Sequence, residues 1–196
     1  IFFVGGVWTI SSFFDSLIGD SYSPLSDKEE RQILSIPINT QRLRTHWDVI
    51  LQEIQSLPGY EGYTYLSSEN GFQSLSYTYM TYHKNEKEQK TAIVLRGDVK
   101  SFEFFHIPMT GKKDIPEEGN RVYVDEQFMH QLQADGNTGT VRLGNTDYQI
   151  AGTYKALFKQ SNMTKQGNGV GSVFLPSEWK GICYVKFASS ADMKDT

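Results

Sequence analysis

One segment after residue 39 carries apolar side chains at a helical period. The apolar positions follow one another at spacings of four, three, four and three residues: Leu43, Trp47, Ile50, Ile54 and Leu57. Such a row lies on one face of a helix. Thr40 or Asn39 can cap the start of this helix. Pro58 and Gly59 mark its end, because proline cannot continue a helix and glycine accepts the turn that follows. The pattern predicts a helix over 40–57.

Strand-forming residues dominate most of the remaining chain. Runs rich in aromatic and β-branched side chains, broken by polar turns, predict strands at 63–66, 75–82, 92–95, 121–124, 172–175 and 182–187. Residues 140–153 predict a hairpin that turns at Gly144 and Asn145, since these residue types tolerate the positive φ of such turns.

Two short helices are expected between these strands. Asp98 can cap a helix that presents Phe102 and Phe105 on one face. Asp125 can cap another, whose apolar face holds Phe128, Met129 and Leu132. Because strands and helices alternate irregularly, the sequence predicts an α+β fold with a mixed sheet and interspersed short helices.

The first forty residues differ from the rest. Residues 1–14 (IFFVGGVWTISSFF) hold nine large apolar side chains and no charge. Fourteen residues are too few to cross a bilayer, which takes about 20. The segment can be the outer end of a membrane helix, or an aromatic-rich first element that packs on the domain. Residues 21–39 are polar, contain Pro24, Pro37 and a charge run, and favour a solvated linker with one short helix.

Composition narrows the function classes. With 38% hydrophobic residues the chain has material for one sizeable core, which excludes a disordered or collagen-like protein. A net charge of −4 without a basic cluster argues against nucleic acid as a partner. The lone thiol, Cys183, cannot form a disulfide within the chain.

No motif for catalysis, metal binding or cofactor binding is found. The four histidines, at 46, 83, 106 and 130, have no metal-ligand spacing, and no nucleophile elbow is present. The glycine-rich stretch 167–171 lacks the Lys-Ser/Thr pair and the following helix of a phosphate-binding loop. We therefore expect no catalytic, cofactor-binding or metal-ligating residues, and no enzyme activity.

Tyrosines concentrate between residues 60 and 82. Tyrosine is enriched at protein interfaces because it combines a large apolar body with a polar tip. The candidate interaction surface comprises Tyr63, Tyr65, Tyr77, Tyr79 and Tyr82. The alternative, that these are ordinary half-buried strand residues, stays open.

Several segments of the chain follow one another in a recognisable order. Residues 104–108 (FFHIP) are followed by Gly111, and residues 121–128 (RVYVDEQF) then lead from a predicted strand into a predicted helix. The strand segments 139–144, 148–153, 172–176 and 184–187 come next. This order resembles the MacB-like periplasmic core domain of MacB- and FtsX-type ABC transporter permeases. In that family the first passage reads Leu-Gly-Ile-Pro, and a strand-to-helix segment and successive strands follow it.

The resemblance implies a two-lobed extracytoplasmic domain placed between the first and second membrane helices of a bacterial inner-membrane permease. On this interpretation residues 1–20 end a first membrane helix, 21–39 form a stalk, and 40–196 form the core domain. The partners implied are the permease's own membrane helices, a separate ATPase subunit, a second permease copy and a periplasmic protein. The function implied is non-catalytic transmission of ATP-driven helix motion. The alternative is a periplasmic carrier that binds a lipid or peptide beside the tyrosine strands.

Overall fold

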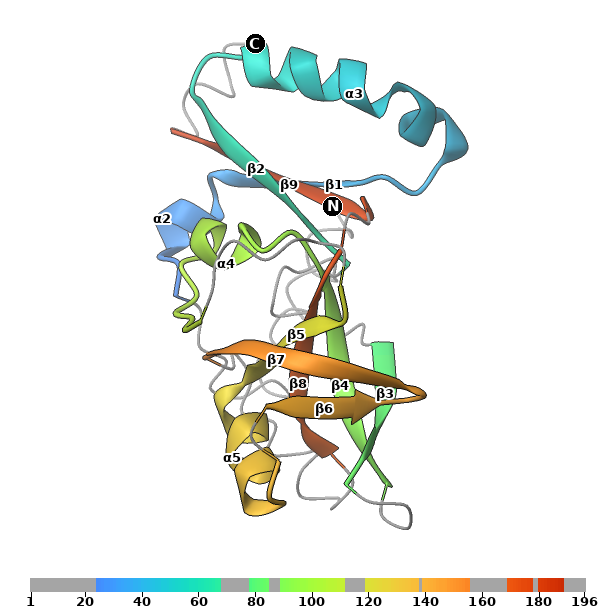
Figure 1. Cartoon of the computed structure of the whole chain (residues 1–196). Helices are drawn as coiled ribbons and strands as arrows, with labels where there is room; N and C mark the ends of the chain where they lie inside the picture. The colour runs from blue at the N-terminus through green and yellow to red at the C-terminus, as the bar shows by residue number, and fades with distance from the viewer. Residues whose placement is uncertain are drawn as a thin grey trace, which may run out of the picture.

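The computed structural model describes residues 24–67, 78–84, 89–111, 119–137, 139–155, 169–177 and 180–188. These residues form two lobes stacked end to end (Figure 1). The upper lobe is a three-stranded sheet under a long helix, and the lower lobe is a ring of strands with one helix at its side. The mixed sheet with a few short helices confirms the predicted α+β class.

The upper lobe is built from strands that come from opposite ends of the chain. Its order is β1 (Ile33–Pro37), β9 (Ile182–Phe187) and β2 (Tyr60–Leu66), all antiparallel. Alternate residues of β9, namely Cys183, Val185 and Phe187, join the core cluster under α3 (Gln41–Ser56). On the other face of β9, Ile182 and Tyr184 join a different cluster, which also contains Phe174 and Tyr123 of the lower lobe.

Helix α3 forms where the periodic pattern predicted it. Thr40 is the cap, and its side chain accepts a hydrogen bond from the Leu43 amide at 3.2 Å. Trp47 and Leu51 are buried against the sheet. The Trp47 indole donates to the Tyr65 hydroxyl at 2.8 Å, which fixes the helix to β2. Local pattern and tertiary packing therefore agree for this element.

The lower lobe is a closed ring of six strands. Following the pairings from β4 (Gln89–Gly97) leads through β3 (Thr78–His83), β6 (Thr140–Leu143), β7 (Thr146–Tyr154), β5 (Arg121–Asp125) and β8 (Gly169–Pro176) back to β4. The β4–β8 and β5–β7 pairs are parallel and the others antiparallel. Because the ring is closed, its strands leave no edge exposed that could pair with a strand of another chain.

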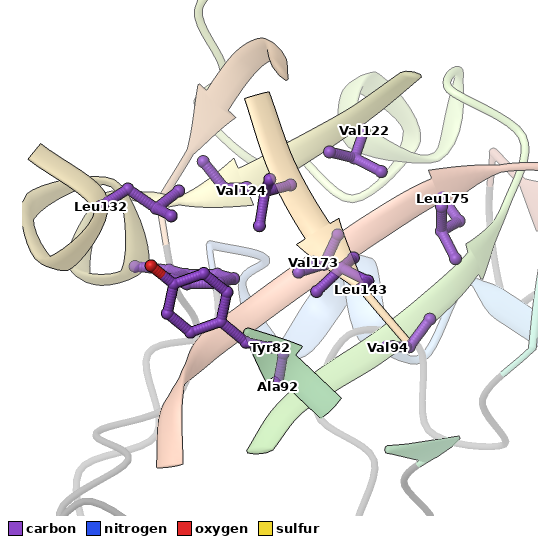
Figure 2. Close-up of a cluster of buried hydrophobic side chains, with 11 residues drawn as sticks. Tyr82, Ala92, Val94, Val122, Val124, Leu132, Leu143, Val173 and Leu175 are labelled. Atoms are coloured by element: carbon purple, nitrogen blue, oxygen red, sulfur yellow. The ribbon is translucent and has the colours of Figure 1, made fainter. Parts of the chain in front are cut away.

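Aliphatic side chains and two aromatic ones, Tyr82 and Phe128, fill this ring. Figure 2 shows side chains from several strands converging on one interior, with Leu132 reaching in from α5 (Glu126–Ala134). Tyr82 is 0% exposed and stacks edge-on against Phe128 at a centroid distance of 5.1 Å. The lobe interior is a packed core.

A third cluster joins the two lobes. Strands β2 and β4 meet at the pair Leu66 and Gly97. A Cβ on Gly97 would lie 2.3 Å from the Tyr65 carbonyl oxygen, so only glycine permits this approach. Helix α4 (Ser101–Phe104) lies at the junction and buries Phe102. The cluster draws residues from both lobes, so the hydrophobic contact between them is continuous.

Two expectations about local structure need correction. Residues 33–37 were assigned to a linker but form strand β1, because Ile36 and Ile38 pack into the upper core and the backbone pairs with β9. The short helix expected in that linker is present as α2 (Asp27–Glu30). Asp98 was expected to cap α4, but the residue at the N-cap position is Lys100. The Asp98 carboxylate accepts a hydrogen bond from the Lys100 amide instead. Asp125 caps α5 as predicted.

Strand β1 is one edge of the sheet. On either side of β1, the Phe187 amide donates to the Gln32 carbonyl and the Ile38 amide donates to the Gly181 carbonyl. Because hydrogen-bonded positions alternate along an antiparallel strand, the even-numbered residues of β1 are the ones that bond to β9. Pro37 therefore points its nitrogen away from β9, where the missing N–H costs no ladder bond. A proline at this position also blunts the open edge against pairing with another chain.

Candidate functional site

The candidate site is the place where the chain enters and leaves the domain. Strand β1 is the first strand after α2, and its antiparallel neighbour β9 is the last strand of the described chain. The Gln32 side-chain amide donates to the Ala188 carbonyl, and the Phe187 amide donates to the Gln32 carbonyl at 3.0 Å. Gln32 is only 8% exposed. Entry and exit are thus clamped side by side at one end of the upper sheet.

Helix α2 forms the entry and is closed by a capping box. The Ser26 backbone and hydroxyl both donate to Glu29 Oε2, at 2.9 and 2.8 Å, and the Glu29 amide donates back to Ser26 Oγ at 3.4 Å. These hydrogen bonds lower the pKa of Glu29, and the bond from the Ser26 backbone contributes most. The segment therefore has a defined local structure.

The entry segment also rests on the junction core. Leu25 and Ile33, on either side of α2, pack against the cluster that contains Phe102, Phe105 and Tyr184. Apolar contacts in a close-packed interior transmit displacement, because such packing is not compressible. Residues on both sides of α2 are therefore in packing contact with the cluster that joins the two lobes.

A second contact links the entry to the end of α4. His106 Nδ1 lies 3.5 Å from Glu29 Oε1. His106 follows α4 in a left-handed conformation, with φ 55°. The Ile107 amide donates to the Phe102 carbonyl and the His106 amide to the Glu103 carbonyl. These two bonds define a Schellman ending, in which glycine is the usual residue at the position of His106.

The candidate tyrosines do not form one surface. Tyr63 and Tyr65 lie on β2 under α3, partly buried, with ring centroids 5.4 Å apart. Tyr82 lies inside the lower lobe, where its hydroxyl donates to Asp135 at 3.2 Å. Tyr79 lies in β3, and nothing is described of its side chain; Tyr77 lies outside the described residues. Tyr82 is thus a core residue, whereas a partner contact at Tyr63 and Tyr65 stays a prediction.

A buried polar network ties three strands together in the lower lobe. Asp125 is 0% exposed; it accepts from the Phe128 amide at 2.6 Å and from the Ser172 hydroxyl at 2.7 Å, and also from the Ser172 amide. The Tyr154 hydroxyl donates to Ser172 Oγ at 2.7 Å. Burial raises the pKa of Asp125, although these hydrogen bonds oppose the shift. The network joins β5, β7 and β8 around a helix cap.

The described residues offer no metal centre. No group of three or more His, Cys, Asp or Glu side chains that could hold an ion occurs among them. Cys183 is buried in the upper core, and burial raises the pKa of its thiol to about 12. A thiol in such surroundings is a poor nucleophile.

Two hollows lie on the outside of the β6–β7 hairpin. One, of about 550 Å³, is lined by Arg121, Tyr148, Gln149 and neighbouring residues. The other, of about 600 Å³, is lined by His83, Arg142, Asp147 and further polar side chains. Both hollows are open to solvent, and the second is mainly polar, whereas pockets that bind small molecules are mostly concave and apolar.

Helices in the described part of the chain are short. The longest, α3, has 16 residues, and none there has the length and apolar character needed to cross a membrane.

Comparison with known proteins identifies the fold. No protein-family model and no curated protein matches the chain. The solved structures that are similar to it include two with TM-scores above 0.5. One is the extracellular domain of the noncanonic ABC-type transporter YknZ from Gram-positive bacteria, with 9% identity, a TM-score of 0.51 and coverage of 83% of this chain and 86% of that one. The other is the periplasmic region of MacB from Actinobacillus actinomycetemcomitans, with 10% identity, a TM-score of 0.54 and coverage of 86% and 81%.

A domain of a protein assigned as a permease from Porphyromonas gingivalis is also similar, with 16% identity, a TM-score of 0.43 and coverage of 71% of this chain. The chain spans 65% of the length of that structure.

Both of these solved structures are parts of proteins that lie outside the cytoplasm, one extracellular and one periplasmic. This chain has the MacB-like periplasmic domain fold, as its sequence predicted.

The order of segments along the chain was sufficient to anticipate this fold. The pairing of Gln32 with Ala188 and the contact of His106 with Glu29 could not be found in the same way, because their partners lie 156 and 77 positions apart. For β1 the sequence does carry a signal: residues 33–38 (ILSIPI) hold four large aliphatic side chains in six positions, which indicates a strand rather than a linker.

Proposed function

We propose that this chain is an extracytoplasmic domain inserted between two membrane helices of a bacterial ABC permease. In this role it performs no chemistry and transmits ATP-driven helix motion to a second permease copy or to a periplasmic protein. The observation that carries the proposal is the clamp between entry and exit, in which β1 and β9 pair and Gln32 binds the Ala188 carbonyl. A domain inserted between two neighbouring membrane helices needs its two ends side by side.

The contacts of the entry segment support a mechanical role. Residues 24–33 are held by the capping box, by the β1–β9 ladder and by the packing of Leu25 and Ile33 on the junction cluster. Motion of the stalk is thereby converted into a rigid-body shift of the lobes, which is a common way of carrying a signal away from a membrane. The fold that the chain shares with extracytoplasmic transporter domains is consistent with this placement.

The test uses the intact permease with its ATPase subunit. A flexible insert of about six Gly and Ser residues between Arg31 and Gln32 lengthens the stalk connection without touching either core. We expect ATP hydrolysis to persist and transport output to be lost. The control is the same insert in the exposed hairpin turn at Asn145, which lies outside the path from stalk to core.

A milder pair of variants addresses the clamp itself. Gln32→Ala removes the side-chain bond to Ala188, whereas Gln52→Ala alters an exposed glutamine on α3. We expect weaker coupling of ATP hydrolysis to output only in the first variant. Full output after the insertion at Arg31 would contradict a transmitting role.

A further inference from the structure

His106 adopts a backbone conformation that a glycine would adopt more easily. Its φ of 55° makes it the one non-glycine residue with positive φ among the described residues. Left-handed backbone disfavours residues that carry a Cβ, and such strain persists where the surrounding structure holds it. A histidine at this position therefore suggests that its side chain has a use. The imidazole, which is 46% exposed, is directed at Glu29 of the entry helix.

The capping box fixes the orientation of the Glu29 carboxylate. One of its oxygens, Oε2, is occupied by Ser26 in the capping box. The other, Oε1, lies 3.5 Å from His106 Nδ1. The carboxylate is thus oriented by α2 and presents its second oxygen to the end of α4. Since α2 lies in the entry segment and α4 at the lobe junction, the contact spans the path along which we propose that motion passes.

Among the described residues, Glu29 is the acidic group that lies within ion-pair distance of the imidazole. From α2, Asp27, Lys28 and Glu30 are exposed, and from α4, Glu103 is exposed while its carbonyl accepts from the His106 amide. From β9, Lys186 acts on Glu29 electrostatically but has its own partner, Glu61, at 3.8 Å.

We propose that the Glu29–His106 contact is a proton-operated latch between the entry segment and the body of the domain. Histidine is the side chain that changes charge between about pH 5 and 8. When His106 is protonated, the imidazolium attracts the Glu29 carboxylate and the latch is closed. As the pH rises and the proton is lost, this attraction is lost, and α2 is held more loosely, by the packing of Leu25 and Ile33 on either side of it. The latch makes the stalk connection stiffer at acidic than at neutral extracytoplasmic pH.

The role of the latch in transport rests on the proposed function, but the latch itself is testable without transport. Hydrogen exchange in the full 196-residue chain, in a mild detergent, reports opening of α2. The probes are the amides of Glu30, Arg31 and Gln32, which donate to the carbonyls of Ser26, Asp27 and Glu29. Protection factors corrected for intrinsic exchange are compared at about pH 5.5 and about pH 7.5.

We expect two- to fivefold greater protection of these amides at the lower pH, roughly the effect of a partly exposed ion pair. Glu29→Gln should abolish the pH dependence and keep the helix, because glutamine also completes a capping box. His106→Gln should abolish it as well. His46→Gln, which changes an exposed histidine on α3, is the matched control and should retain the wild-type dependence.

His106→Gly separates the latch from a purely structural role. Glycine relieves the backbone strain, so the thermal midpoint should be preserved or raised while the pH dependence of α2 protection disappears. The proposal is overturned if wild-type protection is equal at both pH values, or if either the Glu29 or the His106 variant keeps the wild-type dependence. That failure would leave the stalk-insertion experiment, and with it the proposed function, untouched.

Discussion

The buried carboxylate of Asp125 allows the sharpest test of the energetics of this fold. Replacement by alanine removes the cap of α5 and leaves three donors without an acceptor in a buried site: the Phe128 amide, the Ser172 amide and the Ser172 hydroxyl. A lost cap costs about 1 kcal/mol, and each buried donor left unpaired costs about 1–3 kcal/mol. With entry of water into the vacated space, we expect a loss of about 3–5 kcal/mol.

Replacement by asparagine should be milder. The side-chain oxygen of Asn can accept a hydrogen bond from the amide of either Phe128 or Ser172. Its NH₂ group then faces the amide of the other residue, so that two donors point at each other. One mismatched donor pair costs about 1–2 kcal/mol. The Tyr154→Phe variant is the control at the edge of the network. It removes only the Tyr154 hydroxyl, and the Ser172 hydroxyl can still donate to Asp125. The expected order of destabilisation is Tyr154→Phe, then Asp125→Asn, then Asp125→Ala.

The assay is urea unfolding followed by circular dichroism, repeated over a range of pH. Burial raises the pKa of Asp125 above its ordinary value, so the folded protein holds this proton more tightly than the unfolded chain. The resulting stabilisation is fully present below the unfolded pKa, near about 4, and is lost as the pH rises through the folded pKa. The stability advantage of wild type over Asp125→Asn should therefore be largest at low pH.

The opposite trend would refute this reasoning. An advantage that grows with pH would show that the hydrogen bonds to the carboxylate outweigh burial and lower its pKa. Equal stability of the alanine and asparagine variants would show that the donors of Ser172 and Phe128 find water in the folded protein.

Three further predictions concern the backbone, the thiol and the sheet edge. Gly152→Ala should lower stability by about 3 kcal/mol or more in thermal unfolding, because its Cβ would lie 1.9 Å from the Thr110 carbonyl oxygen. Gly62→Ala, whose Cβ would meet nothing within 4 Å, is the matched control. Alkylation of Cys183 by iodoacetamide should be about a thousandfold slower in the folded than in the urea-unfolded chain, since burial raises its pKa to about 12. Pro37→Val should leave stability nearly unchanged but promote self-association, measured by light scattering, because it restores an outward N–H on an open edge.

Much of the secondary structure was predictable because its causes are local. The helix that contains Trp47 has its cap, its apolar row and its stop within 20 residues, and α5 begins at the capping aspartate that the sequence indicated. The hairpin around Gly144, with φ 58°, likewise depends on a turn and its two flanking runs. In each case the hydrogen-bond partners lie a few positions apart.

The candidate interaction surface was less predictable, since a shared residue type does not imply a shared location. Tyr63 and Tyr82 lie in different lobes and different clusters, although both come from tyrosine-rich strands. Whether a strand residue is buried depends on what packs against its face of the sheet. The alternation of apolar and polar residues along one strand does not reveal this.

The sequence by itself determined the α+β class, the order of elements and the helix caps, because periodicity and capping act over one or two turns of chain. Only the tertiary structure decided that β4 and β8 close a ring, that β1 and β9 place entry beside exit, and that His106 meets Glu29. The physical reason is that backbone donors and acceptors are alike at every residue. Which strands pair is therefore settled by the joint packing of side chains distant in sequence, and that packing exists only in the folded chain.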